Sequence, residues 1–217
     1  MEFEKIHNKG QAKLFNNHYV EYLTKTHPLV IWGLYSPVLF LLPYYASTFL
    51  IDPMRIFWLY IGGMFFWSFF EYLMHRFIFH FIAESPKTTR LIYVLHGNHH
   101  EYPRDKERLF MPAVPSLIIS SFIFMMMYFI MGRDSFSFFP GFMFGYLIYG
   151  SMHYAIHAWN PPFKWMKGLW RNHHLHHYKQ QQKGFGVSST LWDHIFGTTF
   201  DLKKEKEDKE KVRELMY

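Results

Sequence analysis

The chain has 217 residues, half of them apolar and 22% aromatic, and it carries a formal net charge of +6. The absence of cysteine excludes disulfides and thiolate metal ligands in any compartment. Because long apolar segments are present, we attribute the positive charge to contact with anionic lipid head groups, and we expect no nucleic-acid partner.

The first 27 residues are polar and lack the apolar core and cleavage site of a signal peptide, so we expect them in the cytoplasm or at the membrane interface. Four apolar segments follow, and we expect each to cross the membrane as a helix: 28–51, 56–70, 112–131 and 136–149. The end of the chain alternates acidic and basic residues, which is typical of a solvated tail. The predicted division is therefore an N-terminal segment at 1–27, a four-span domain at 28–201 and a charged tail at 202–217.

Basic residues predict the orientation of these spans. Of the 23 lysines and arginines, 21 lie before the first span, between the second and third, or after the fourth, whereas the two short turns hold only Arg55 and Arg133. The positive-inside rule then places both termini and the central loop in the cytoplasm. We expect a multi-pass protein of a bacterial inner membrane rather than of the endoplasmic reticulum.

Histidines form the most distinctive pattern in the sequence. Ten of the 15 fall into four spaced clusters, all on the predicted cytoplasmic side: His75 and His80; His96, His99 and His100; His153 and His157; and His173, His176 and His177. In each triplet the spacing i, i+3, i+4 shares one helical face, and we expect its three imidazoles to converge on one metal ion. His75 and His80 are five residues apart, a rotation of about 500° on an α-helix. We therefore expect the helix to end or distort before His80.

Ten imidazoles exceed the needs of one ion, so the sequence predicts two metal ions with about five ligands each. The spacing leaves Fe(II), Zn(II), copper and nickel open. Nearby acids, including Glu71 and Asp193, are predicted to orient the imidazoles from outside the ligand set. An all-histidine site at a bilayer surface indicates a lipid substrate. Attack on an unactivated C–H bond needs an oxidant that iron with O₂ supplies and zinc does not.

Several stretches resemble the fatty acid hydroxylase superfamily, and within it the fatty acid 2-hydroxylase group. The stretches that carry this resemblance are 71–80, 95–112, 145–157 and 173–198, and the last of these includes Gly184-Phe185-Gly186 and Trp192-Asp193-His194. The resemblance implies a di-iron enzyme that uses O₂ and two electrons to hydroxylate C2 of a fatty acid or of a sphingolipid N-acyl chain. It also implies that the ten clustered histidines are the metal ligands, with no other catalytic residue. Purified protein is expected to carry zinc in some preparations.

The chain departs from that group at three points. Nothing in it resembles a cytochrome b5 domain, so a separate electron donor of the cytochrome b5, ferredoxin or reductase type is expected. Gly150 stands where relatives often have an acidic residue, and Ala158 where they often have a third histidine. His174 and His194 fall outside the ligand set, and we interpret them as supporting or surface residues. Three tyrosines are candidate substrate contacts, with interfacial anchoring as the alternative: Tyr149, Tyr154 and Tyr178.

The sequence thus predicts an all-α integral membrane protein with four transmembrane helices and a cytoplasmic, histidine-rich cap that holds two metals. Two other functions stay open. A carotenoid or sterol C–H oxygenase would use the same metal ligands, and product analysis would separate it from an acyl hydroxylase. A non-catalytic zinc-binding membrane protein would consume no O₂.

Overall fold

The computed structural model of the protein describes residues 6–49 and 52–202, and over these ranges it contains helices and no strand. The described residues form two compact units that alternate along the chain. We call 15–49, 52–69 and 110–151 the apolar unit, and 6–14, 70–109 and 152–202 the histidine unit. The all-helical class expected from the sequence is confirmed. Most of the predicted charged tail, 203–217, lies outside the described residues.

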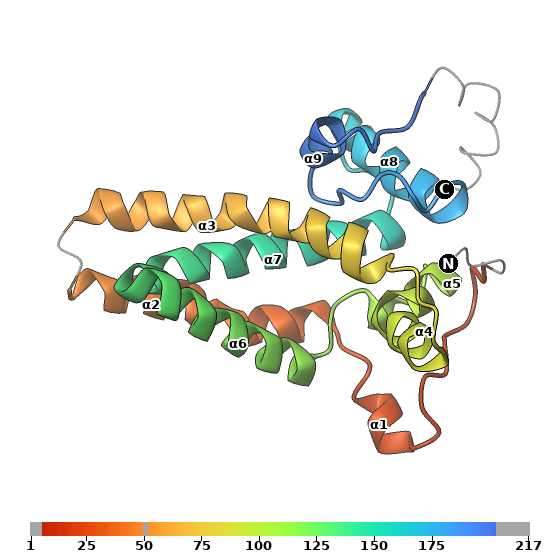
Figure 1. Ribbon diagram of the computed structural model, residues 1–217, viewed down its shortest axis with the longest axis horizontal. Coiled ribbons are helices and arrows are strands. Elements are labelled where there is room, and N and C mark those ends of the chain that lie inside the picture. Colours follow the sequence, from red (N-terminus) through yellow and green to blue (C-terminus); the bar gives the residue numbers. More distant parts are fainter. Residues whose placement is uncertain (1–5, 50–51, 203–217) are drawn as a thin grey trace. The chain divides into compact units, whose positions relative to one another are not determined.

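The apolar unit is built from four long helices, which run alongside one another in Figure 1: α2 (Pro28–Ser47), α3 (Pro53–Leu73), α6 (Ala113–Met131) and α7 (Ser135–Ala158). A short helix, α1 (His18–Tyr22), precedes them. His27 begins α2 by accepting a hydrogen bond from the Leu29 amide, and Pro28 supplies the fixed φ of a first helical residue. Between α6 and α7 the chain turns through η4 (Gly132–Asp134), where Gly132 has φ of +57°. This left-handed conformation favours glycine and ends α6.

Close contacts and shared hydroxyl groups hold these helices together. A Cβ atom at Gly63 of α3 would overlap the Phe138 carbonyl oxygen of α7, and one at Gly141 would overlap the Tyr60 carbonyl oxygen. Glycine at both positions therefore lets the two backbones touch, as small residues do between membrane helices. The buried Tyr35 hydroxyl of α2 lies 2.7 Å from the Ser116 hydroxyl and 2.9 Å from the Ser120 hydroxyl of α6.

Three segments of the described chain are long and apolar enough to cross a membrane: Pro28–Ser47, Pro53–Phe79 and Lys106–Ala158. Large apolar side chains point outward from them, among them Phe40 at 73% exposure and Phe129 at 91%. An exposed apolar surface of this kind fits contact with lipid. Two helices extend beyond the predicted spans at both ends. Helix α3 runs from Pro53 to Leu73, and α7 runs from Ser135 through His153 and His157 to Ala158.

The histidine unit contains the ends of α3 and α7 and a set of shorter helices. These are the π-helix η1 (Met74–Phe79), α4 (Pro86–Ile92), the π-helix η2 (Tyr93–Gly97), α5 (Asn98–Glu101), the 3₁₀ turns η3 (Lys106–Arg108) and η5 (Lys164–Met166), α8 (Lys167–Tyr178) and α9 (Leu191–Ile195). Trp170, the largest fully buried side chain, donates its indole N–H to the Trp159 carbonyl and ties α8 to the segment that follows α7.

Candidate metal centre

The ten clustered histidines meet inside the histidine unit as two groups of five buried side chains. The first histidine group is His75, His80, His96, His100 and His176; the second is His99, His153, His157, His173 and His177. In each group one ring nitrogen from every residue lies within 4.8 Å of the others. The two groups of five agree with the ligand count expected for two metal ions.

Membership of the groups corrects one expectation. Neither triplet converges on a single point, because His99 joins the second group while His96 and His100 join the first. Likewise, His176 belongs to the first group, whereas His173 and His177 belong to the second. In each triplet the pair at i, i+4 shares a target, whereas the remaining histidine is rotated by about 60–100° and faces the other group. Each triplet therefore contributes histidines to both groups, and this connects the two groups into one centre.

A π-helical turn brings His75 and His80 together. The His80 amide donates to the His75 carbonyl at 3.2 Å, an i+5 hydrogen bond that closes η1. In a wider turn of this kind, residues five apart come to the same side, and the two imidazole centroids lie 5.1 Å apart. The expected distortion of the helix before His80 is therefore present, as a π turn.

A second π turn precedes His99. In η2 the Asn98 amide donates to the Tyr93 carbonyl, five residues earlier. The Asn98 side chain also donates to the carbonyls of Tyr93 and Val94, both at 2.9 Å. These bonds satisfy backbone acceptors that an α-helix would have paired differently. Asn98 thereby stabilises the turn that presents His96.

The ring nitrogens are spaced as ligands of a metal ion are. In the first group the Nε2 atom of His96 lies 3.1 Å from that of His75 and 3.0 Å from that of His100. In the second group three Nε2 pairs lie at 2.8–3.1 Å. With metal–nitrogen bonds of about 2.1 Å, ligands at 90° lie about 3.0 Å apart and tetrahedral ligands about 3.4 Å. The observed spacings fit neighbouring ligands of a five- or six-coordinate ion.

Among the described residues, two buried ring nitrogens of the first group have no hydrogen-bond partner, the Nε2 atoms of His80 and His176. A buried polar atom without a partner is costly, and a metal ion removes that cost by taking the lone pair. The orphaned nitrogens and the imidazole-only donor set both fit a borderline divalent metal.

Burial keeps these imidazoles neutral. It lowers the pKa of His96, His99 and His100 well below the ordinary histidine value, and neighbouring imidazoles lower it further. Burial is also the main cause of the lowered pKa of His173, His176 and His177. Since only the neutral ring can bind a metal, the site is set for metal binding at physiological pH.

A loop after α8 orients two histidines of the first group through its backbone. The Phe185 carbonyl lies 2.5 Å from Nδ1 of His75, and the Lys183 carbonyl lies 2.7 Å from Nδ1 of His176. A carbonyl can only accept, so each Nδ1 carries the proton and each Nε2 presents its lone pair inward.

Two buried carboxylates hold that loop in place. Asp193 of α9 accepts from the amides of Phe185 and Gly186, each at 2.9 Å, and from the Thr198 hydroxyl at 2.7 Å. Glu71 of α3 accepts from the Val187 and Ser188 amides at 2.8 and 2.9 Å and from the Ser188 hydroxyl. The expectation that acids orient the imidazoles thus holds in an indirect form, since Glu71 and Asp193 contact the loop rather than the rings.

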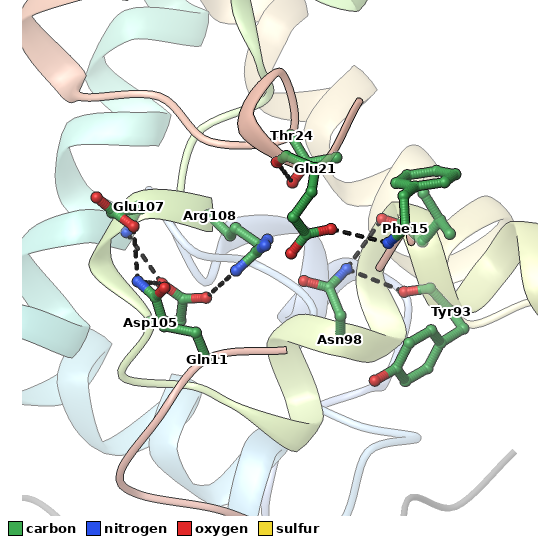
Figure 2. Close-up of polar contacts among 10 residues, drawn as sticks. Gln11, Phe15, Glu21, Thr24, Tyr93, Asn98, Asp105, Glu107 and Arg108 are labelled. Atoms are coloured by element: carbon green, nitrogen blue, oxygen red, sulfur yellow. Dashed lines mark hydrogen bonds and ion pairs between the residues drawn. The ribbon is translucent and has the colours of Figure 1, made fainter. Parts of the chain in front are cut away.

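The second group has a comparable backbone support. Nδ1 of His153 lies 3.2 Å from the carbonyl of Leu109. The segment before Leu109 is fixed by Asp105, around which Figure 2 shows Gln11, Glu107 and Arg108. Arg108 donates to Asp105 at 2.6 Å in an ion pair whose side chains are 4% and 3% exposed.

The remaining candidate residues lie outside the two groups. Tyr149 packs on Trp67, with ring centroids 5.7 Å apart, and Tyr154 packs on Trp159. Tyr178 stacks on His174 and donates to Asn8. Neither His174, which is buried, nor His194, which is exposed, belongs to a histidine group. At Gly150 a Cβ atom would overlap the Phe110 ring, so this ring occupies the space that an acidic side chain would need.

Comparison with known proteins gives the family. The profile of the fatty acid hydroxylase family matches residues 60–198, which include all ten clustered histidines. The chain belongs to the fatty acid hydroxylase family. The resemblance drawn from the sequence motifs is confirmed, and the enzyme class expected from it, an oxidoreductase, is that of the family.

Individual members of the fatty acid hydroxylase family show how far the similarity extends. The ceramide very long chain fatty acid hydroxylase SCS7 of Saccharomyces cerevisiae is 37% identical over 199 residues, which cover 88% of this chain and 50% of SCS7. The dihydroceramide fatty acyl 2-hydroxylase FAH2 of Arabidopsis thaliana is 32% identical over 86% of this chain and 79% of that relative. The solved structure of full-length scs7p, in which only the hydroxylase domain is visible, matches with a TM-score of 0.82 at 35% identity, over 88% of this chain and 73% of the other.

This member of the family thus spans about half the length of SCS7. A multi-pass membrane protein fits both the apolar helices and these relatives. The expected bacterial inner membrane gains no support, because the relatives named above are from a yeast and a plant.

Proposed function

We propose that the protein is an O₂-dependent hydroxylase that places a hydroxyl group on C2 of a fatty acid or of a sphingolipid N-acyl chain. The observation that carries this proposal is the pair of buried five-histidine groups in a chain with membrane-spanning helices. The names of the relatives, a ceramide fatty acid hydroxylase and a fatty acyl 2-hydroxylase, support the acyl chain as substrate and C2 as the position.

The ten histidines would hold two metal ions, one in each group. Iron is proposed in the active enzyme, because iron with O₂ can oxidise a C–H bond and zinc cannot. The nitrogen spacings of 2.8–3.1 Å support five or six ligands rather than the tetrahedral set typical of structural zinc. Zinc is still expected in some purified preparations, since imidazole sites bind it strongly.

The protein's own residues prepare and protect this centre. Burial excludes water and keeps the rings neutral, and the carbonyls of Phe185, Lys183 and Leu109 fix three imidazoles with their Nε2 atoms inward. Because these imidazole rings are held in place before metal binds, little reorganisation is needed when metals bind or change charge. Tyr149, Tyr154 and Tyr178 remain proposed substrate contacts.

Four membrane spans are proposed, with both termini and the histidine unit in the cytoplasm. A continuous helix of 53 residues, the length of the third apolar segment, would be about 80 Å long against a hydrocarbon layer of about 30 Å. The ring of Phe124 in α6 packs on that of Phe139 in α7 at 5.0 Å, so the two helices fold back on each other and two crossings are the simpler account. The partition into 1–27, 28–201 and 202–217 likewise stays a prediction.

The reaction can be tested by isotope labelling. Iron-loaded protein, supplied with a reductase system, ¹⁸O₂ and acyl lipids, should yield 2-hydroxy acyl lipids with one labelled oxygen and none from labelled water. His176→Ala protein, lacking one ligand, should yield none. A hydroxylated carotenoid or sterol, or a mid-chain alcohol, would overturn the substrate assignment. Failure to consume O₂ with iron bound would favour a non-catalytic zinc protein.

A further inference from the structure

Helix α8 has two faces with different chemistry. Its inner face carries three of the ten clustered histidines, His173, His176 and His177. Lys167, Arg171, His174 and Tyr178 stand at i, i+4, i+7 and i+11 along the helix. At about 100° per residue these four positions lie within about 60° of one another, on the side away from the ligands. We call this stripe the outer face of α8.

A pocket of about 370 Å³ opens along that face. It is lined by His174 and Tyr178 of α8, by Arg104 from the segment after α5, and by residues 156–160 at the end of α7. One of these is His157, a member of the second histidine group. The rings of His174 and His157 lie 6.0 Å apart, so a molecule in this pocket would be one side chain from the proposed metal centre.

The lining of the pocket contains no acidic residue, and Arg104 gives it a positive charge. Between Asp134 and Asp193 the chain holds no acidic residue but five basic ones. Lys167, Arg171 and Arg104 are exposed, and Arg104 lines the same pocket as Tyr178. A surface of this kind attracts an anionic partner and speeds its association at low salt.

We propose that the outer face of α8, together with Arg104, docks an acidic one-electron carrier protein. This inference rests on the proposed function, in which RH + O₂ + 2e⁻ + 2H⁺ gives ROH + H₂O, with C–H oxidised and O₂ reduced. Both electrons must reach a buried centre from outside. On this face a single helix separates the surface from three of the ligands, and the pocket leads to a fourth. The positive charge would also attract an anionic lipid head group, but binding of a head group would not explain why the pocket reaches His157, a proposed metal ligand.

The test compares two ways of driving the same reaction. In the first, a reduced plant-type [2Fe–2S] ferredoxin serves as the acidic carrier. In the second, hydrogen peroxide supplies oxygen and oxidising equivalents together, RH + H₂O₂ giving ROH + H₂O, so no carrier is needed. The variants are the pair Lys167→Glu with Arg171→Glu, and Arg104→Glu alone. Lys87→Glu, at an exposed lysine of α4, is the matched control for a change of surface charge.

We expect the KM for ferredoxin to rise about tenfold or more in both variants, and to lose much of its dependence on salt, while peroxide-driven turnover stays at the wild-type value and Lys87→Glu changes neither. An unchanged KM would overturn the inference, as would an equal loss with peroxide, which marks a structural role. A change seen only in nanodiscs with phosphatidylglycerol, and not in neutral lipid, would assign the face to the bilayer instead. Wild-type protein that forms no product by either route would overturn the proposed function itself.

Discussion

At the scale of residues, the centre depends on groups that never touch the imidazole rings. Asp193 is fully buried, and its two oxygens accept three hydrogen bonds that fix the loop presenting the Phe185 carbonyl to His75. The sequence identified the ten histidines, because regular spacing of a metal-binding residue type is visible without a structure. It could not divide the triplets between two groups, since that depends on what faces each helix.

Replacing Asp193 with asparagine tests this support. The amide nitrogen would face a backbone N–H donor, so at least one buried hydrogen bond would be lost, at a cost of about 1–3 kcal/mol. We expect the metal affinity of the first histidine group to fall about 10- to 100-fold, the usual effect of disturbing groups behind a ligand, with the second group unchanged. Titration against a competing chelator measures the metal affinity of each histidine group.

Asp52→Asn is the control for that experiment, because Asp52 caps α3 on the surface and asparagine caps a helix equally well. Equal weakening of both metals in Asp193→Asn would mean that the substitution acts on folding in general. No weakening of either would mean that the loop does not orient His75.

At the scale of elements, hydropathy predicted where the long helices lie but not how they end. The apolar pattern of the fourth span stops at Tyr149, whereas α7 continues through His153 and His157 to Ala158, because a helix can continue through buried histidines that face a common site. The π turn at His80 was foreseen only as a distortion, since a spacing of five fits no α-helical face. The second π turn, in η2, left no signal in the sequence: its i+5 pairing is stabilised by Asn98, a residue type that is common in many settings.

The arrangement of the four long helices gives a topology prediction. A reporter inserted at Asp52-Pro53 or at Arg133-Asp134 should lie outside the cytoplasm, and reporters at either terminus or at Glu101 should lie inside, because basic residues are retained on the cytoplasmic side. Fusions to alkaline phosphatase and to a fluorescent protein report the two sides. A cytoplasmic signal at Arg133 would contradict four spans and would leave α6 and α7 on one side of the membrane.

At the scale of the whole molecule, the histidine unit buries its chemistry so deeply that folding and metal binding are linked. In the metal-free protein the lowered pKa of His96, His99, His100, His173, His176 and His177 means that the unfolded chain binds protons more readily than the folded one. Stability from these rings is therefore fully present above the unfolded pKa of about 6.5 and is lost as pH falls below it.

Metal-free protein should consequently unfold on mild acidification. Each of these histidines contributes a slope of up to about 1.4 kcal/mol per pH unit below pH about 6.5, so the midpoint of thermal unfolding should fall steeply between pH 7 and pH 5. Bound metal should shift this loss of stability to lower pH, because protons must then compete with the ion for the imidazole nitrogens. Calorimetry in a fixed detergent at several pH values, with and without metal, makes the comparison. A midpoint that is flat over this range without metal would contradict the buried, neutral state of the rings.

The central claim is that the ten histidines form two metal sites of five ligands each, and elemental analysis of purified protein tests it most directly. Wild-type protein loaded with iron should contain two ions per chain. His176→Ala and His99→Ala each remove one ligand from a different group, so each should bring the content toward one ion. His174→Ala, which changes a buried histidine next to the ligands but outside both groups, should keep two. One ion in the wild type, or an equal loss in His174→Ala, would contradict the account.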